Sequence, residues 1–187
     1  MKVAIFDVCR SPEIKKETEA LILSSFFNQE KIDYEVYSND GIWLNKKVLN
    51  KDLIRQHLKQ SDAEIIHLAM HGDNQGLILK WSKAQEIKER VPEDVLTSLD
   101  IKTTSEWQGR VVVSGACSSA QLSRFFLEAG ATGVIAPSTP IPWLNLGRFF
   151  QVFYQALFSS QPTRSALALA IAQFPKFNSY QVYSRSD

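Results

Sequence analysis

Short runs of apolar residues alternate along this chain with longer segments in which apolar residues recur every three or four positions. The short runs are typical of buried strands, and the longer segments are typical of helices that cover a sheet. Strands are predicted at residues 3–8, 34–37, 64–70, 77–81, 110–114, 134–136 and 180–183. Helices are predicted at residues 11–29, 51–59, 119–129, 146–158 and from 162 onward, with a partly helical segment at 86–99 and a polar connection at 102–108. This alternation predicts an α/β domain with a mostly parallel sheet.

The composition favours one globular domain over residues 1–187. Hydrophobic residues make up 44% of the 187, and neither a linker nor a repeat interrupts the pattern. The 21 basic and 20 acidic residues leave a formal net charge of +1, which indicates neither a nucleic-acid nor a membrane partner. Two cysteines make no disulfide framework. The first residues are charged too early for a signal peptide, and no apolar run approaches the ~20 residues of a membrane span, so we expect a cytoplasmic protein.

One predicted strand leads directly into a cysteine, in the stretch Val111-Val-Val-Ser-Gly-Ala-Cys-Ser-Ser119. The β-branched residues predict a buried parallel strand, and the small residues after it allow a tight turn. Cys117 then lies where the strand ends and a helix begins. The carboxyl ends of the strands form the ligand crevice of open α/β sheets, and a helix N-terminus favours a negatively charged sulfur.

A histidine and a glycine follow the preceding strand of the sheet, in Glu64-Ile-Ile-His-Leu-Ala-Met-His-Gly72. His71 is therefore predicted at the same edge of the sheet as Cys117. A histidine beside a cysteine supplies a general base beside a nucleophile. The sequence therefore predicts a His71–Cys117 catalytic dyad.

These two motifs, in this order, resemble those of caspase-like cysteine peptidases, and most of all the CHAT-domain branch, which is itself similar to separases. Further along, the chain also fits the branch at Ala129-Gly-Ala-Thr-Gly-Val-Ile-Ala136 and at the Pro-x-Pro of Pro140 and Pro142. The histidine and cysteine are 46 residues apart, close to the roughly 50 of caspases. Gly115 stands where caspases have the glutamine of Gln-Ala-Cys, so the match is to the wider group.

The resemblance implies a three-layer caspase-like fold with a mostly parallel central sheet, and the activity of a cysteine endopeptidase. In the family, the backbone N–H groups of the glycine after the histidine and of the cysteine form the oxyanion hole, here Gly72 and Cys117. Glycine suits that place because it lets a substrate carbonyl approach closely. The resemblance further implies a protein substrate and a regulated bacterial signalling or antiviral-defence role, with a separate protein partner as a possible regulator. It implies neither a metal nor a cofactor.

Three other residues are candidates for the substrate pocket. Separase-like relatives place an aspartate after the Pro-x-Pro segment to hold a basic P1 side chain, whereas Trp143 stands here. In caspases and legumains an arginine before the first helix holds an acidic or amide P1 side chain, and Arg10 has that place or is a solvated loop residue. Asp7 would instead favour a basic P1. We expect a P1 residue that is not strongly basic.

The remaining histidines and the second cysteine have alternative interpretations. His67 lies on the same side of its strand as His71, and either supports that residue or is a core histidine with its own partner. His57, on a charged helix, is expected to be solvated, and Cys9 to be structural. The five aromatic residues at helical spacing in the segment 146–158 are expected to lie in the core.

Two functions of other classes compete with the peptidase. One is a non-catalytic caspase-like module that binds a partner, although both residues of the dyad are present. The other is a receiver- or flavodoxin-like signalling domain, which would use Asp7 at the end of the first strand. The sequence has no zinc spacing, phosphate loop or serine-hydrolase elbow, and these absences disfavour the corresponding chemistries.

Overall fold

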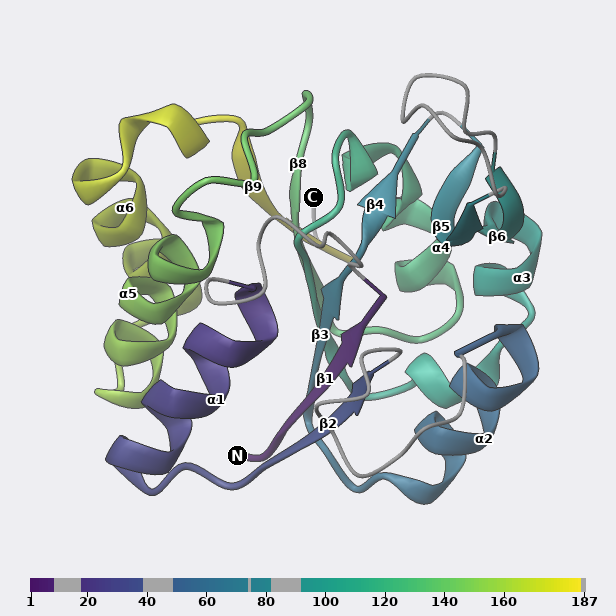
Figure 1. Cartoon of the computed structure of the whole chain (residues 1–187), viewed down its shortest axis with the longest axis horizontal. Coiled ribbons are helices and arrows are strands. Elements are labelled where there is room, and N and C mark those ends of the chain that lie inside the picture. The colour runs from purple at the N-terminus through teal and green to yellow at the C-terminus, as the bar shows by residue number, and fades with distance from the viewer. Residues whose placement is uncertain (9–17, 39–48, 74, 82–91, 186–187) are drawn as a thin grey trace.

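A six-stranded sheet separates two layers of helices in the computed structural model of this chain, which describes residues 1–8, 18–38, 49–73, 75–81 and 92–185 (Figure 1). The strands of this sheet are β1 Val3–Asp7, β2 Tyr34–Ser38, β3 Ile65–Ala69, β7 Val111–Ser114, β8 Gly133–Pro137 and β9 Tyr180–Ser184. They lie in the order β2-β1-β3-β7-β8-β9, and all neighbours are parallel except β9, which is antiparallel to β8. The prediction of a mostly parallel sheet is confirmed.

The helices pack on both faces of this sheet, because its central strands are apolar on both sides. One face carries α1 (Glu19–Glu30), α5 (Leu146–Phe158) and α6 (Thr163–Gln173), as Figure 1 shows. The other carries α2 (Lys51–Gln60), α3 (Ser98–Lys102) and α4 (Ser123–Glu128). Short 3-10 turns lie at η2 (Ser105–Trp107), η3 (Ser119–Leu122) and η4 (Pro175–Phe177). This three-layer arrangement confirms the predicted fold class.

Alternate residues of each central strand enter different cores, as the two-residue period of a strand requires. On β1, Phe6 packs toward α2 and α4, whereas Ile5 packs toward α1 and α5. On the side of α1 and α5, four aromatic residues of α5 lie in the core and are completely buried: Phe149, Phe150, Phe153 and Tyr154. The prediction that these rings are structural is confirmed, with Phe158 only partly buried at the end of the helix.

A second, antiparallel sheet lies beside the end of β3. It consists of β4 (His71–Gly72), β5 (Gly76–Trp81) and β6 (Pro92–Thr97), with β4 and β6 at its edges. The segment 86–99 was predicted to be helical in part, but its residues 92–97 form a strand, and its residues 86–91 lie outside the described residues. Pro92 stands at the first position of an edge strand, where its missing N–H breaks no ladder bond, and Leu96 turns into the core.

Helix boundaries differ from the predictions at three places. Thr18 caps α1 by accepting the N–H of Leu21 at 3.3 Å, and this helix begins at Glu19; residues 11–17 of the helix predicted at 11–29 lie outside the described residues. The expected polar connection at 102–108 instead contains a 3-10 turn that buries Trp107 completely. After Cys117, Ser118 has a left-handed backbone with φ of 54°, and the 3-10 turn η3 precedes the six-residue α4.

Candidate active site

His71 and Cys117 follow two strands that are neighbours in the central sheet. Strands β3 and β7 pair in parallel with Leu68 opposite Ser114, and the Gly115 N–H continues the pairing to the Leu68 carbonyl at 2.9 Å. The sheet therefore brings the His-Gly and Ala-Cys segments to the same edge, as the sequence predicts.

The backbone of Gly72 packs against the backbone of the Cys117 turn. A Cβ atom at Gly72 would lie only 2.7 Å from the Cys117 carbonyl oxygen and 3.0 Å from the Cβ of Ala116. Real Cβ atoms do not approach backbone oxygens so closely, so any larger residue would push the two segments apart. The need for glycine here comes from this contact within the protein itself.

The hydrogen-bond pattern of β4 determines where the Gly72 N–H points. Asp73 donates its N–H to the Gly76 carbonyl at 3.1 Å, which makes Asp73 and Gly76 a hydrogen-bonded pair of the antiparallel ladder. The next pair, Gly72 opposite Leu77, is then of the non-hydrogen-bonded type. The Gly72 N–H therefore points away from β5, to the open edge of the small sheet.

The Cys117 sulfur contacts the loop that connects β8 to α5. Its Sγ accepts the Ile141 N–H at an N···S distance of 3.5 Å and lies 3.7 Å from the Ile141 carbonyl oxygen, to which the thiol donates. Pro140 and Pro142 have no N–H, so Ile141 provides the one backbone donor of this tripeptide. A second bond, from the Ser118 N–H to the Thr139 carbonyl at 3.3 Å, holds the same loop against the turn.

The His71 residue, at the start of β4, is exposed, yet the surrounding protein desolvates its ring enough to lower its pKa below the ordinary value. Desolvation disfavours the imidazolium and therefore favours the neutral ring. A neutral imidazole can accept a proton, which is what a general base requires.

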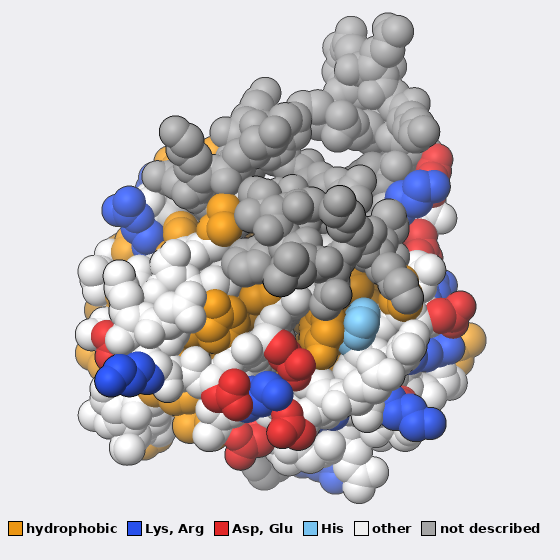
Figure 2. Space-filling model, turned by 60° about the horizontal axis from the view of Figure 1, so that its bottom comes forward, with side chains coloured by type: hydrophobic (Ala, Val, Ile, Leu, Met, Phe, Trp, Pro, Cys, Tyr) orange, Lys and Arg blue, Asp and Glu red, His pale blue; other side chains and the backbone are white. Residues whose placement is uncertain are grey.

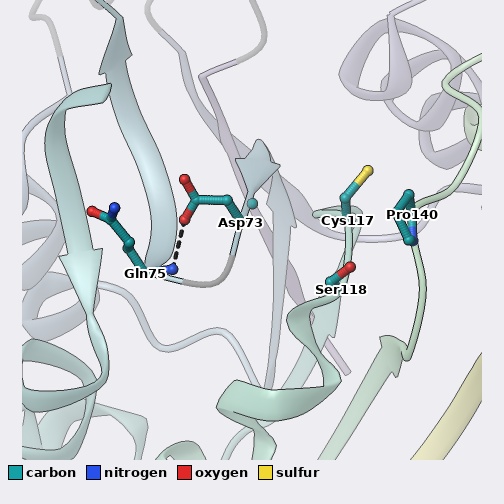
Figure 3. A pocket seen from close by; sticks show the side chains of 6 residues that line it. Asp73, Gln75, Cys117, Ser118 and Pro140 are labelled. Carbon is teal, nitrogen blue, oxygen red and sulfur yellow. Dashed lines mark hydrogen bonds between the residues drawn. The ribbon is translucent and has the colours of Figure 1, made fainter. Parts of the chain in front are cut away.

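A pocket of about 370 Å³ opens between the two segments. Its described lining residues are Gly72, Asp73, Gln75, Cys117, Ser118 and Pro140. Figure 3 shows Cys117, Ser118 and Pro140 on one side of it, with Asp73 and Gln75 on the other. Cys117 therefore borders a cavity large enough for an amino-acid side chain.

Buried polar residues support the strand end from inside the protein. The Tyr180 hydroxyl donates to the Ser114 carbonyl at 3.1 Å, and burial raises the pKa of Tyr180 well above its usual value. The carboxylate of Glu19 occupies the space beside Gly115, with both oxygens within 2.6 Å of where a Cβ would be. Both contacts fix the backbone two to three residues before the cysteine.

Comparisons with known proteins place this arrangement in a family. A model of the CHAT domain family matches residues 8–179. The chain belongs to the CHAT domain family. No curated protein matches it in sequence.

Solved cysteine proteases share the fold of this CHAT domain. A secreted C11 cysteine protease from Bacteroides thetaiotaomicron, in complex with an irreversible peptide inhibitor, matches with a TM-score of 0.60 at 12% identity over 94% of the chain. The Arg-specific cysteine proteinase gingipain R matches with a TM-score of 0.55 at 12% identity over 98% of the chain. A complex of the RgpB pro- and mature domains from Porphyromonas gingivalis matches with a TM-score of 0.57, also at 12% identity over 98% of the chain. The chain spans 58% of the first protein and 46% and 47% of the other two. The CHAT domain thus has a caspase-like cysteine-protease fold.

The other residues predicted for the site are dispersed. His67 is fully buried and bonds to Glu19 and Tyr154, so it is a core histidine with its own partners and does not bond to His71. Asp7 is buried at the end of β1, where its Oδ2 accepts the Ser38 hydroxyl at 3.1 Å. Trp143 lies two residues after Ile141 with 58% of its surface exposed. Cys9 and Arg10 lie outside the described residues.

His57 differs from its prediction as a solvated residue. Its ring is half-buried and stacks on the Tyr37 ring with centroids 4.1 Å apart. The polar pattern of α2 does not predict this contact, because Tyr37 lies in β2, which is distant in the sequence.

Sequence reasoning missed Ile141 and Asp73 as members of the site. The Pro-x-Pro signal could have indicated Ile141, since a residue between two prolines carries the local N–H. In the described part of the chain, no group of three or more metal-ligating side chains comes together, and no helix is long and apolar enough to cross a membrane.

Proposed function

We propose that this CHAT domain is a cysteine endopeptidase that uses Cys117 as nucleophile and His71 as general acid and base. The observation that carries the proposal is the contact between Gly72 and the Cys117 turn at the ends of two neighbouring parallel strands. It supports a site in which a nucleophile, a base and two backbone donors act on one carbonyl group. The shared fold with cysteine proteases adds independent support.

In the proposed first step, the Cys117 sulfur attacks the scissile carbonyl carbon after His71 has taken the thiol proton. The carbonyl oxygen becomes an oxyanion, which accepts hydrogen bonds from the N–H groups of Gly72 and Cys117. His71 then returns the proton to the leaving amine as the C–N bond breaks, which leaves a thioester on Cys117.

In the second step, water hydrolyses this thioester. His71 removes a proton from the attacking water, and the same two N–H groups hold the second oxyanion. When the C–S bond breaks, the proton returns to sulfur and the carboxylic acid product leaves. The reaction balances without a metal or a redox cofactor.

The Ile141 contact supports control of this site by another molecule. Sγ is held by a backbone N–H and carbonyl of the β8–α5 loop, so a substrate must replace or share that contact when it reaches the sulfur. We propose a protein substrate, a regulatory protein partner and a cytoplasmic role in a regulated bacterial signalling or antiviral-defence pathway, as the family resemblance implies.

Substrate profiling with a diverse peptide library tests the function directly, with Cys117→Ala as the blank. Cleavage that disappears in this variant supports the peptidase. Uncleaved peptides at every condition, with and without candidate partners, would favour the non-catalytic module that binds a partner.

A further inference from the structure

Asp73 is a charged residue that lines the pocket and has no part in the proposed chemistry. It follows the His71–Gly72 pair directly and forms the turn between β4 and β5. Its Oδ1 accepts the N–H groups of Gln75 and Gly76 at 2.7 and 3.2 Å. Its own backbone is also fixed, because its N–H donates to Gly76 and its carbonyl accepts the Gln121 Nε2 at 2.9 Å.

These bonds hold the carboxylate in place before any ligand arrives. Both N–H groups bond to Oδ1, so Oδ2 has no hydrogen-bond partner within the described residues. In Figure 3 the bonded oxygen faces Gln75 and the second oxygen projects away from that bond. A carboxylate fixed in this way can accept a hydrogen bond from a cation without losing further side-chain entropy.

The described lining of the pocket carries a negative charge. Of the described residues that line it, Asp73 alone has a charged side chain, and the others are Gly72, Gln75, Cys117, Ser118 and Pro140. A basic substrate side chain entering this pocket would meet a carboxylate and two uncharged polar groups. An acidic side chain would meet a like charge and be disfavoured.

The position of Asp73 in the chain indicates which side of the scissile bond it serves. The general acid must lie on the side of the leaving amine, because it protonates that nitrogen. Asp73 is two residues from His71 in the same short segment. The pocket wall that it forms is therefore on the leaving-group side, and the side chain next to the bond on that side is P1′.

We infer that Asp73 binds a basic P1′ side chain, so that the substrates of this CHAT domain carry lysine or arginine immediately after the cleaved bond. The inference rests on the proposed peptidase function and adds the substrate class. It leaves P1 free to be non-basic.

Asp73→Asn is the decisive variant, because it changes the charge and preserves the turn. An asparagine Oδ1 still accepts the N–H groups of Gln75 and Gly76, so the loop keeps its shape. Glu30→Gln is the matched control, since it removes one negative charge from an exposed position at the far end of α1.

The first measurement compares cleavage of peptides that differ only at P1′, with lysine, arginine, norleucine or glutamate there. We expect the parent protein and Glu30→Gln to prefer lysine and arginine, and Asp73→Asn to lose about tenfold in kcat/KM for these peptides while norleucine is unaffected. A basic preference that survives in Asp73→Asn, or one that appears at P1, would overturn the inference.

The second measurement makes the inference independent of turnover. Cys117→Ala, with and without Asp73→Asn, is titrated with the same fluorescent peptides. If the lysine peptide binds more tightly than the norleucine peptide, and Asp73→Asn removes this difference, the acidic pocket is supported. This holds even if no peptide is cleaved, and in that case only the proposed function fails. Equal binding of both peptides to Cys117→Ala overturns the acidic pocket.

Discussion

The Nε2 atom of His67 lies 2.6 Å from Oε1 of Glu19, in a core that is closed to solvent on the histidine side. On the other edge of the ring, Nδ1 lies 2.9 Å from the Tyr154 hydroxyl. A neutral ring satisfies both contacts, since Nε2–H donates to the carboxylate and Tyr154 O–H donates to Nδ1. Burial and the nearby Glu19 charge raise the pKa of Tyr154, which keeps its proton available. This chain of bonds joins α1, β3 and α5 next to Gly115.

Removing the histidine from this chain should destabilise the fold more than removing the hydroxyl. His67→Leu leaves the Glu19 carboxylate and the Tyr154 hydroxyl without their partner, so we expect a loss of about 2–4 kcal/mol in the free energy of unfolding. Tyr154→Phe removes one neutral donor and should cost about 1 kcal/mol. Urea unfolding monitored by circular dichroism measures both, and exposed Gln56→Ala on α2 serves as the control within about 0.5 kcal/mol. Equal stability of His67→Leu and the parent protein would contradict this role.

The meeting of His71–Gly72 with Cys117 could be predicted from the sequence because parallel strands place their carboxyl ends at one edge. Two apolar runs, each followed by polar or small residues, were sufficient to predict that these two segments lie together. The same reasoning could not find Glu19, because its partner His67 is 48 residues away and the contact depends on how α1 packs on β3. It also could not distinguish the two interpretations of His67.

At residues 92–97 the local composition led to a wrong prediction, because this charged segment is a strand and not part of a helix. Glu93 and Asp94 made the segment look like a solvated helix. Pairing with β5 made it a strand, and that partner is an apolar run whose residues Leu77, Ile78 and Leu79 are buried. Pairing between distant segments overrides weak local preference.

Loss of either residue of the dyad should abolish cleavage. Cys117→Ala removes the nucleophile and His71→Ala removes the group that transfers protons, so we expect rates at least ~10³-fold lower in both. Both variants should unfold at the temperature of the parent protein within a few degrees, because neither side chain is completely buried. Near-parental turnover by His71→Ala would show that another residue is the base.

Gly72→Ala should separate the two halves of the site. The new methyl group would lie 2.7 Å from the Cys117 carbonyl oxygen, which is backbone and cannot rotate away. We expect at least a ~10²-fold loss in kcat as the oxyanion donors move apart. Gly133→Ala in β8 is the matched control, since its nearest contact is an ordinary 3.7 Å to the Tyr183 carbonyl. Similar activity of the two variants would argue against Gly72 as a member of the oxyanion hole.

The pH dependence should reflect the desolvated His71. Because desolvation lowers its pKa, the neutral base persists to more acidic solution than an ordinary histidine would allow. The acid limb of kcat/KM should therefore have its midpoint below 6.5, the value of an unperturbed histidine. The unfolded chain binds this proton at higher pH than the folded chain, so His71 also destabilises the fold as the pH decreases through that window. An acid limb centred above 6.5 would contradict the desolvated environment.

The two thiols should differ in their reactivity toward a limiting amount of iodoacetamide at neutral pH. Cys117 borders an open pocket that admits a reagent, and the Ile141 N–H donates to its sulfur. His71 adds a proton acceptor on the neighbouring strand end. A short 3-10 turn, Ser119–Leu122, follows Cys117 where the sequence predicted the start of a long helix. We therefore expect mass spectrometry to find Cys117 labelled well before Cys9, and His71→Ala to slow labelling at Cys117 without changing Cys9. Equal labelling of both cysteines in a protein that cleaves peptides would show that Cys117 is not a primed nucleophile.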